Sequence, residues 1–210
     1  SNVNLNGWKI FFSGVNIEKK LSTQSQRFNE FGLTGCLNFY KTQFNDVMIE
    51  AKNGMCEDSI NIVNSYGHIN TLKVQNGYAD GIDIDFSKLK IDFIRVRNSL
   101  NDCFDVSSGI YEIIDFQAVS CGDKGISVGE KSILSAKRVS VDTALLAVSS
   151  KDQSSLLMDS GEFINVSNCF ESAQKKQEFG GARIKFNEVN CDADNLIDKN
   201  SSIVKNNYEL

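Results

Sequence analysis

The sequence predicts an all-β fold, a right-handed parallel β-helix of about eight or nine coils with about 22 residues each. Three observations lead to this prediction. A triplet of apolar, polar and apolar residues recurs at steps of 20 to 23 residues. Residues inside each repeat alternate as in strands, and no helical stripe is present. The chain contains no proline, which suits strands whose N–H groups all bond to a neighbouring coil.

The triplets mark the opening strand of each coil. Their first residues are Val15, Leu37, Ile60, Ile82, Phe104, Ile126 and Leu146. Alternation along a strand sends Ile82 and Ile84 into the core, so that Asp83 and Asp85 point outward. A left-handed hexapeptide helix would repeat about every 18 residues, and a leucine-rich repeat would show its own consensus. Neither pattern is found, so a right-handed parallel β-helix is the architecture that fits the sequence.

Later segments of the coils repeat in the same register. Residues 69–76 align with 91–98 and with 113–120, each time after 22 positions. A polar ladder is expected where these segments end, at Asn53, Asn76, Asn98, Ser120, Asp142, Asn168 and Asn190. Stacked polar side chains at a turn bond to the backbone and to one another. We therefore interpret the ladder as structural.

The two ends of the repeat are less regular. Residues 8–12 form a strand-like segment, and the polar stretch 19–27 is expected to be a loop or a short cap. The step from Leu146 to Phe170 is 24 residues, and the step from Phe170 to Leu196 is 26. These longer steps predict protruding loops, of which residues 174–181 form the longest.

Composition narrows the class of protein. A repeat that runs through almost all of the 210 residues predicts one domain, 1–210. The net charge of −5 argues against nucleic acid as a partner. No run of about 18 apolar residues occurs, which argues against membrane insertion. Because the chain starts without Met and almost inside a strand, we expect a fragment or module of a longer protein.

Six cysteines are present, and their spacing contains no CxxC pair and no nearby histidine, which argues against a zinc site. Cys169 and Cys191 are 22 residues apart. That spacing would place them on adjacent coils roughly 4.8 Å apart, where a disulfide could form. Small buried residues are nevertheless what a solenoid core uses. We therefore predict reduced, packed thiols.

The densest group of candidate binding residues lies on the opening strands. One outward file holds Asn61, Asp83, Asp105 and Ser127, and the next holds Asp85, Ser107 and Gly129. Neighbouring carboxylates in such files are roughly 5 to 7 Å apart. Paired carboxylates at this separation can act on a glycosidic bond, and clustered oxygen ligands can hold Ca²⁺. The simplest alternative is a solvated acidic stripe.

A second acidic ladder lies in the turn before this strand, at Asp58, Asp80 and Asp102, with Lys124 on the next rung. Stacked carboxylates repel one another and raise at least one pKa, unless turn N–H groups stabilise them. We interpret the ladder as turn capping with a salt bridge. Glu130, Lys151 and Asp152 follow at the same edge and complete a shallow polar groove that suits hydroxyl-rich ligands.

Other features argue against an enzyme. The only histidine, His68, is expected on a turn, away from the acidic strands. Arg95 and Arg97 lie on a different segment and are expected to pair with surface acids. No phosphate-binding loop, nucleophile elbow or serine triad can be assembled.

Several runs carry a resemblance to a known group. They are ADGIDIDFS at 79–87, NDCFDVSSG at 101–109, DKGISVGEKS at 123–132, SKD at 150–152 and KKQEFGG at 175–181. This pattern, over about residues 33 to 185, resembles β-helix modules of bacterial polysaccharide-related and cell-surface proteins, some of them attached to a CotH-type kinase region. The group implies no catalytic residues. Pectate-lyase-like and polygalacturonase-like enzymes share only the architecture, and the chain lacks the Asp-Asp, Gly-His-Gly and Arg-Ile-Lys set of the latter.

Three hypotheses follow. The first is a non-catalytic module that binds or positions a glycan, or an adjacent domain of the same protein, through Asp83, Asp85, Asp105, Lys124, Glu130, Lys151 and Asp152. The second is a lyase, hydrolase or epimerase that uses Asp83, Asp85 and Asp105, with Lys124 or Lys151 as charge partner. The third is a structural spacer that forms homo-oligomers through its open ends. No cofactor is indicated apart from Ca²⁺ as an alternative occupant. The sequence is compatible with a bacterial protein that is located either at the cell envelope or in the cytoplasm.

Overall fold

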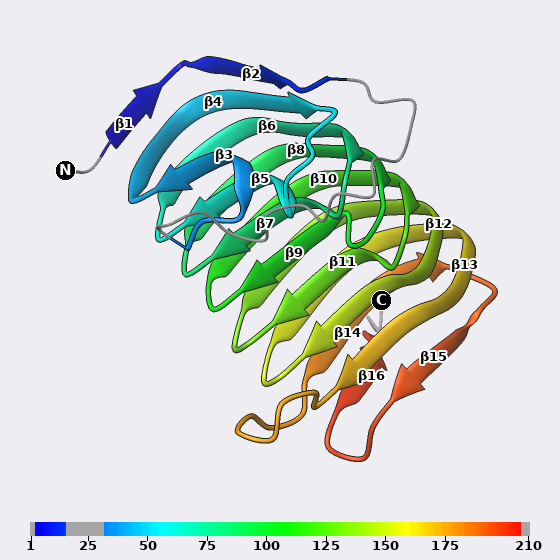
Figure 1. The fold of residues 1–210 in the computed structure, drawn as a ribbon. Coiled ribbons are helices and arrows are strands. Elements are labelled where there is room, and N and C mark those ends of the chain that lie inside the picture. The colour runs from blue at the N-terminus through cyan, green and yellow to red at the C-terminus, as the bar shows by residue number, and fades with distance from the viewer. Residues whose placement is uncertain (1–2, 16–31, 207–210) are drawn as a thin grey trace.

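The computed structural model describes residues 3–15 and 32–206, and these residues form a parallel β-solenoid of about eight turns with no helix (Figure 1). The predicted parallel β-helix is therefore confirmed. The triplet at Val15 continues into residues 16 and 17, and the polar stretch 19–27 follows it, so both lie outside the described residues. The expected strand at 8–12 is found as β2.

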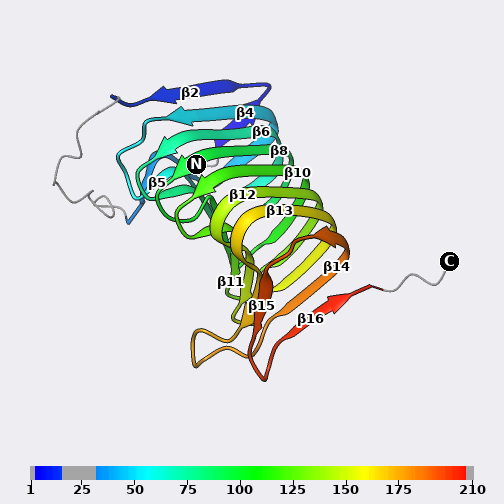
Figure 2. The ribbon, with the colours of Figure 1, turned by 90° about the vertical axis from the view of Figure 1, so that its right-hand side faces the viewer.

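Each central coil contains one short and one long strand. The short strands are β3 (Gly35–Tyr40), β5 (Asp58–Val63), β7 (Asp80–Asp85), β9 (Phe104–Ser107) and β11 (Lys124–Gly129). The long strands are β4 (Thr42–Lys52), β6 (Tyr66–Gly77), β8 (Lys88–Ser99), β10 (Ile110–Cys121), β12 (Ile133–Lys151) and β13 (Ser155–Ala173). Strands β1 (Val3–Asn6), β2 (Lys9–Ser13), β14 (Arg183–Asn190), β15 (Asp194–Ile197) and β16 (Ser202–Lys205) complete the two ends. All pairings are parallel, and the long strands bend around the stack (Figure 2).

Apolar ladders fill the interior of the solenoid. Ile60, Ile82, Phe104, Ile126 and Val148 stack on successive coils, and all five side chains are buried. Such burial removes their surface from water and is the main stabilising contribution to the stack. The inward positions of the predicted triplets thus form the core.

The predicted register is wrong at the seventh triplet. Ile126 pairs with Val148 rather than with Leu146, so the triplet of this coil is Val148, Ser149 and Ser150. The expected loop before Phe170 is absent, because Val148 pairs with Phe170 after the usual 22 residues. The apolar, polar, apolar pattern points to Leu146 because the third residue of the true triplet, Ser150, is an inward polar residue. Its Oγ lies 2.7 Å from the Ser154 Oγ. The second expected loop is present, because residues 174–182 contain no strand.

The polar ladder at the end of the long segments is confirmed for Asn53, Asn76, Asn98 and Ser120, all with positive φ. It continues through Thr143 and Asn165, so the predictions of Asp142, Asn168 and Asn190 are wrong. Asp142 pairs with Val119 and therefore lies one position before the turn. The left-handed turn conformation, which the sequence does not show, determines the register here.

Asn76 provides a test of this ladder. Its Nδ2 donates to Asn53 Oδ1 at 2.9 Å, and its Oδ1 accepts from Asn98 Nδ2 at 3.0 Å. We expect Asn76→Ala to lower the free energy of unfolding by about 2 kcal/mol, because Ala loses both bonds and tolerates positive φ poorly. Asn76→Gly keeps the turn and should lose about half as much. Urea unfolding measures both, and an alanine variant as stable as wild type contradicts the ladder.

The prediction of reduced thiols is wrong, because all six cysteines form disulfides. The bridges are Cys36–Cys56, Cys103–Cys121 and Cys169–Cys191, with Cα–Cα distances of 5.4, 5.4 and 6.2 Å. The partners are 20, 18 and 22 residues apart, which is about one circuit of the solenoid. Each bridge therefore closes a coil at a corner. The spacing of Cys169 and Cys191 reflects a coil lengthened by the loop 174–182.

The bridges follow a longer period of their own. Cys36, Cys103 and Cys169 each lie one residue before a member of the same core ladder, namely Leu37, Phe104 and Phe170. The steps between these cysteines are 67 and 66 residues, which is three repeats. One coil in three is thus closed covalently.

Candidate functional site

The short strands bring the predicted acidic residues together on one face. Asp83 of β7 pairs with Asp105 of β9, and Asp85 pairs with Ser107. Asn61 continues the first file on β5, and Ser127 continues it on β11. Neighbouring rungs of a parallel sheet are about 4.8 Å apart. We use the name acidic face for the surface formed by Asp58, Asp80, Asp83, Asp85, Asp102 and Asp105.

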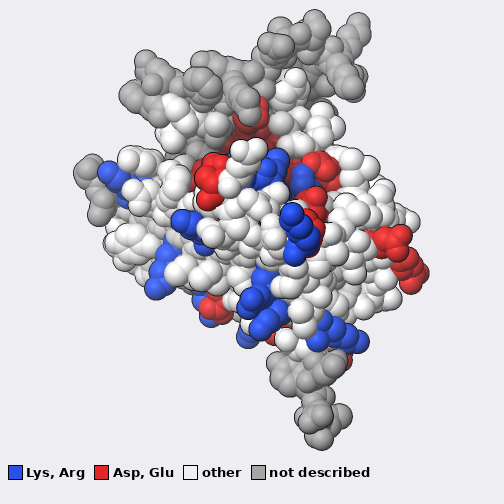
Figure 3. Space-filling view, turned by 90° about the horizontal axis from the view of Figure 1, so that it is seen from below, with Lys and Arg blue, Asp and Glu red and all other residues white. Residues whose placement is uncertain are grey.

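This face is recessed rather than an open solvated stripe. Asn61 is 2% exposed and Ser127 is fully buried. Asp83, Asp85 and Asp105 are half-buried. Figure 3, which views the molecule from below, shows acidic and basic side chains interleaved over its centre. The simplest alternative offered by the sequence, a screened surface stripe, therefore does not describe this site.

Burial and mutual repulsion raise the pKa of the three carboxyl groups on the opening strands. Burial is the largest cause for Asp83, whose pKa lies well above its usual value, and the charge of Asp85 adds to it. Burial and the charge of Asp105 raise the pKa of Asp85 to about 6. Burial also raises the pKa of Asp105, against the opposing charge of Lys151. The ionised form of all three carboxyl groups is thus disfavoured on this face.

The hydrogen bonds of these carboxyl groups leave most of their oxygen atoms available. Asp83 Oδ2 accepts a bond from Asn61 Nδ2 at 3.2 Å. The carboxyl group of Asp85 accepts no hydrogen bond from the residues that the structure describes, and only its backbone carbonyl is bonded. A ligand with several hydroxyl groups finds both acceptors and, where the carboxyl is protonated, donors on this face.

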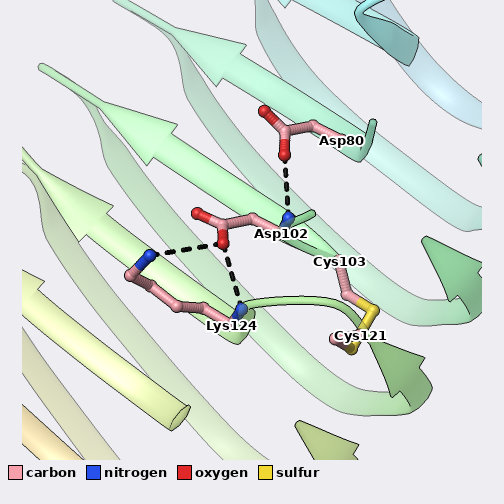
Figure 4. Close-up of a disulfide and its surroundings, with 5 residues drawn as sticks. All are labelled: Asp80, Asp102, Cys103, Cys121 and Lys124. Carbon is pink, nitrogen blue, oxygen red and sulfur yellow. Dashed lines mark hydrogen bonds and ion pairs between the residues drawn. A yellow bond between two sulfur atoms is a disulfide. The ribbon is translucent and has the colours of Figure 1, made fainter. Parts of the chain in front are cut away.

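The turn ladder is built as expected, and Figure 4 shows its lower rungs. Asp80 Oδ1 accepts from the backbone N–H of Asp102 at 2.8 Å. Asp102 Oδ1 accepts in turn from the backbone N–H of Lys124 at 3.0 Å, and Lys124 Nζ lies 3.4 Å away. Cys103 follows Asp102 directly, so its disulfide with Cys121 holds the same corner. The predicted turn capping is confirmed for Asp80 and Asp102, and the salt bridge is confirmed for Lys124. Asp58 does not extend this capping, because the N–H of Asp80 donates to the Glu57 carbonyl.

The same ladder shows the predicted rise in pKa. Burial raises the pKa of Asp58 to about 7 against a hydrogen bond from Thr34, with the charge of Asp80 adding to it. Burial and the charge of Asp102 raise the pKa of Asp80 to about 7. Burial raises the pKa of Asp102 to about 6, and the Lys124 ammonium opposes this rise. The N–H bonds reduce the repulsion but do not cancel the desolvation.

The remaining predicted residues, Glu130, Lys151 and Asp152, differ in how their side chains are already engaged beside the acidic face. Glu130 contacts the side chains of Ser107 and Lys176, whose hydrogen bonds outweigh burial and lower its pKa. Lys151 is near enough to Asp105 to influence its pKa. Asp152 is only 1% exposed, and its Oδ1 accepts from the N–H groups of Lys175 and Lys176, each at 2.7 Å. Asp152 thus anchors the loop 174–182, and its carboxylate is occupied.

Sequence reasoning missed Lys176 as a neighbour of this face. The loop that carries it leaves the solenoid after β13 and returns to Glu130, which is 46 residues earlier. The longer repeat step indicates an insertion at this point, but it does not indicate toward which coil the inserted loop turns. Thr34, which donates to Asp58, lacked any repeat signal because it precedes the first short strand.

The basic residues set aside by the sequence lie on other strands. His68 is within β6 rather than on a turn, and its Nε2 is 2.8 Å from Asp92 Oδ2. The expectation that Arg95 pairs with a surface acid is confirmed by Asp115, at 2.9 Å. No ion pair of Arg97 is found among the described residues. None of these groups belongs to the acidic face.

Residues 3–15 and 32–206 contain no group of three or more His, Cys, Asp or Glu side chains arranged to hold a metal ion. The same residues include no helix of the length and apolarity needed to cross a membrane. No protein-family model, curated protein or solved structure matches the chain. The described residues form a parallel β-solenoid.

Proposed function

We propose that this chain is a non-catalytic β-solenoid module that binds or positions a glycan on its acidic face. The observation that carries the proposal is the recessed double row of Asp83, Asp85 and Asp105 beside the amino groups of Lys124 and Lys151. Sugar hydroxyls both donate and accept hydrogen bonds. Carboxyl groups with a raised pKa and ammonium groups, repeated at the spacing of the coils, match such a ligand.

The disulfides support a setting outside the reducing cytosol. All six cysteines are paired, and disulfides form and persist in oxidising environments. We propose a cell-envelope location on this ground, in line with the resemblance to bacterial cell-surface and polysaccharide-related modules. The cytoplasmic alternative requires these bridges to survive glutathione and thioredoxin.

Binding can be tested on a glycan array with the purified 210-residue chain, Asp83→Asn and Asp105→Asn. We expect each variant to bind its glycan about 10- to 100-fold more weakly, because a hydrogen bond to a charged group contributes about 1.5–3 kcal/mol. Asp46→Asn is the matched control, since Asp46 is an exposed residue of β4. Wild-type binding by both site variants, or no binding of any glycan by wild type, contradicts the proposal.

A polysaccharide-active enzyme is the second candidate, because the raised pKa of Asp83 and Asp105 is what a general acid requires at neutral pH. The captured glycan can be incubated with the protein and assayed for new reducing ends and for unsaturated products. We expect none. Turnover that disappears in Asp83→Asn or Asp105→Asn replaces the binding module with an enzyme.

A further inference from the structure

A groove of about 320 Å³ lies on the bend of the long strands, on strands other than those of the acidic face. Nine residues line it, three from each of β10, β12 and β13: Asp115, Phe116, Gln117, Arg138, Val139, Ser140, Ser160, Gly161 and Glu162. We call it the bend groove. Its volume is within the range of small-molecule sites, about 300–1,000 Å³.

Residue size explains why the groove opens at this level of the stack. On β8, the coil before, the two outward files hold Phe93 and Arg95, which pair with Asp115 and Gln117. Farther along these two files, Ser140 of β12 follows Gln117, and Ser160 of β13 follows Arg138. Small side chains there leave space between the larger ones on neighbouring rungs. The hollow is thus a consequence of sequence at defined ladder positions.

Asp115 holds the charged wall of the bend groove in place. Its Oδ1 is 2.9 Å from Arg95 Nη1, and its Oδ2 is 3.0 Å from Arg138 Nη2. The side chain of Asp115 is 14% exposed, whereas that of Arg138 is 61% exposed. Arg138 is therefore positioned by a half-buried partner while its outer N–H groups face solvent.

Most of the other polar side chains of the groove have no protein partner, and the exception is Ser160, whose Oγ donates to the Lys137 carbonyl at 3.1 Å. Within the part of the chain that the structure describes, the side chains of Gln117, Ser140 and Glu162 make no hydrogen bond or ion pair. Asp115, Glu162 and Arg138 give the nine lining residues one net negative charge, which Arg95 offsets by pairing with Asp115 from outside the lining. The lining therefore presents free donors and free acceptors beside charges that their surroundings balance.

We propose that the bend groove binds one neutral sugar unit as a site separate from the acidic face. An anion would meet the carboxylates of Asp115 and Glu162, and a cation would meet the guanidinium of Arg138. Sugar hydroxyls can accept from Arg138 and Gln117 while donating to Glu162. This proposal does not rest on the proposed function, because its residues lie on the long strands rather than the short ones.

The test is a titration of the ¹⁵N-labelled chain with methyl glycosides of glucose, galactose, mannose and N-acetylglucosamine, followed by NMR. At least one glycoside should shift amide signals of the bend groove with a Kd in the millimolar range. Ser140→Leu, which fills the groove without changing charge, should weaken binding at least tenfold. Glu162→Gln should weaken it several-fold, since it keeps shape and loses the charged acceptor.

Two controls separate the outcomes. Ser135→Leu lies on β12 outside the groove and should bind like wild type. Asp83→Asn removes a carboxylate of the acidic face and should leave groove binding unchanged, so failure of one site is distinguishable from failure of the other. Absence of shifts with all four glycosides, shifts confined to the acidic face, or unaltered binding by Ser140→Leu overturns the proposal.

Discussion

Replacement of Cys103 and Cys121 together by Ala is expected to lower the free energy of unfolding by about 3 kcal/mol. The bridge closes a segment with a sequence separation of 18 residues, and the loss of chain entropy in the unfolded state predicts about this value. Both cysteines are buried against the core, so the smaller alanine side chains add a packing penalty. Urea unfolding without reductant measures the difference through the shift of the midpoint.

The position of a disulfide along the stack determines which coils lose stability when the disulfide is removed. Each coil of a solenoid is stabilised mainly by its neighbours, so stability is close to a sum of coil and interface contributions. Cys103–Cys121 is the middle bridge, and its removal leaves five coils between the outer two without a covalent closure. Hydrogen exchange should therefore increase first in β9 to β11. Replacement of Cys36 and Cys56 is the matched control, because that bridge lies near one end.

Two results contradict this account. Wild-type protein treated with a thiol reductant under denaturing conditions and refolded in its presence should match the double alanine variant or be less stable. Equal midpoints for oxidised and reduced protein mean that the bridges do not stabilise the fold. Free thiols in the purified oxidised protein, detected by mass spectrometry after alkylation, contradict the bridges themselves.

Stability is expected to fall as pH rises from about 4 to about 7. The folded-state pKa values of Asp58, Asp80 and Asp85 are about 7, 7 and 6, whereas their ordinary value is 3.8. The folded chain therefore binds more protons than the unfolded chain in this window. The contribution to stability is fully present below about pH 3.8 and is lost as pH passes through the folded-state values. Lysine neighbours lower the pKa of Glu130, which opposes this trend only at lower pH.

Asp85→Asn tests most directly how a raised carboxyl pKa makes stability depend on pH. A pKa of about 6 in place of 3.8 corresponds to about 3 kcal/mol, which solvent screening and coupling to Asp105 reduce. We expect the variant to be about 1–3 kcal/mol more stable than wild type at pH 8 and equally stable at pH 4. Asp46→Asn, in an exposed position on β4, is the control. A variant that is less stable than wild type at pH 8 contradicts the desolvation argument.

Together, these variants connect stability to function. Carboxyl groups that repel one another in a recessed face reduce the stability of the fold, and sites kept for binding often carry such a penalty. We therefore expect Asp83→Asn to gain stability above pH 7 while it loses glycan binding. A loss of both stability and binding would indicate that Asp83 has only a structural role.

Much of the fold follows from local patterns that the chain repeats. Alternation and spacing alone place Ile60, Ile82 and Phe104 in the core, because the period of a strand determines which side chains share a face. The acidic files of Asp83 and Asp105 followed from the same register. Local rules failed where one position breaks the pattern, as at Ser150, an inward polar residue whose hydroxyl is bonded inside the corner.

The sequence by itself determined the stacked coils, the apolar interior and the grouping of carboxylates on the short strands, because each depends on a spacing of 22 residues. Only the tertiary structure decided that this face is recessed, that Lys176 returns to Glu130, and that six cysteines pair. It also revealed the bend groove. The physical reason is that burial, loop direction and corner geometry depend on distances between coils, whereas a repeat reports only which residues occupy equivalent positions.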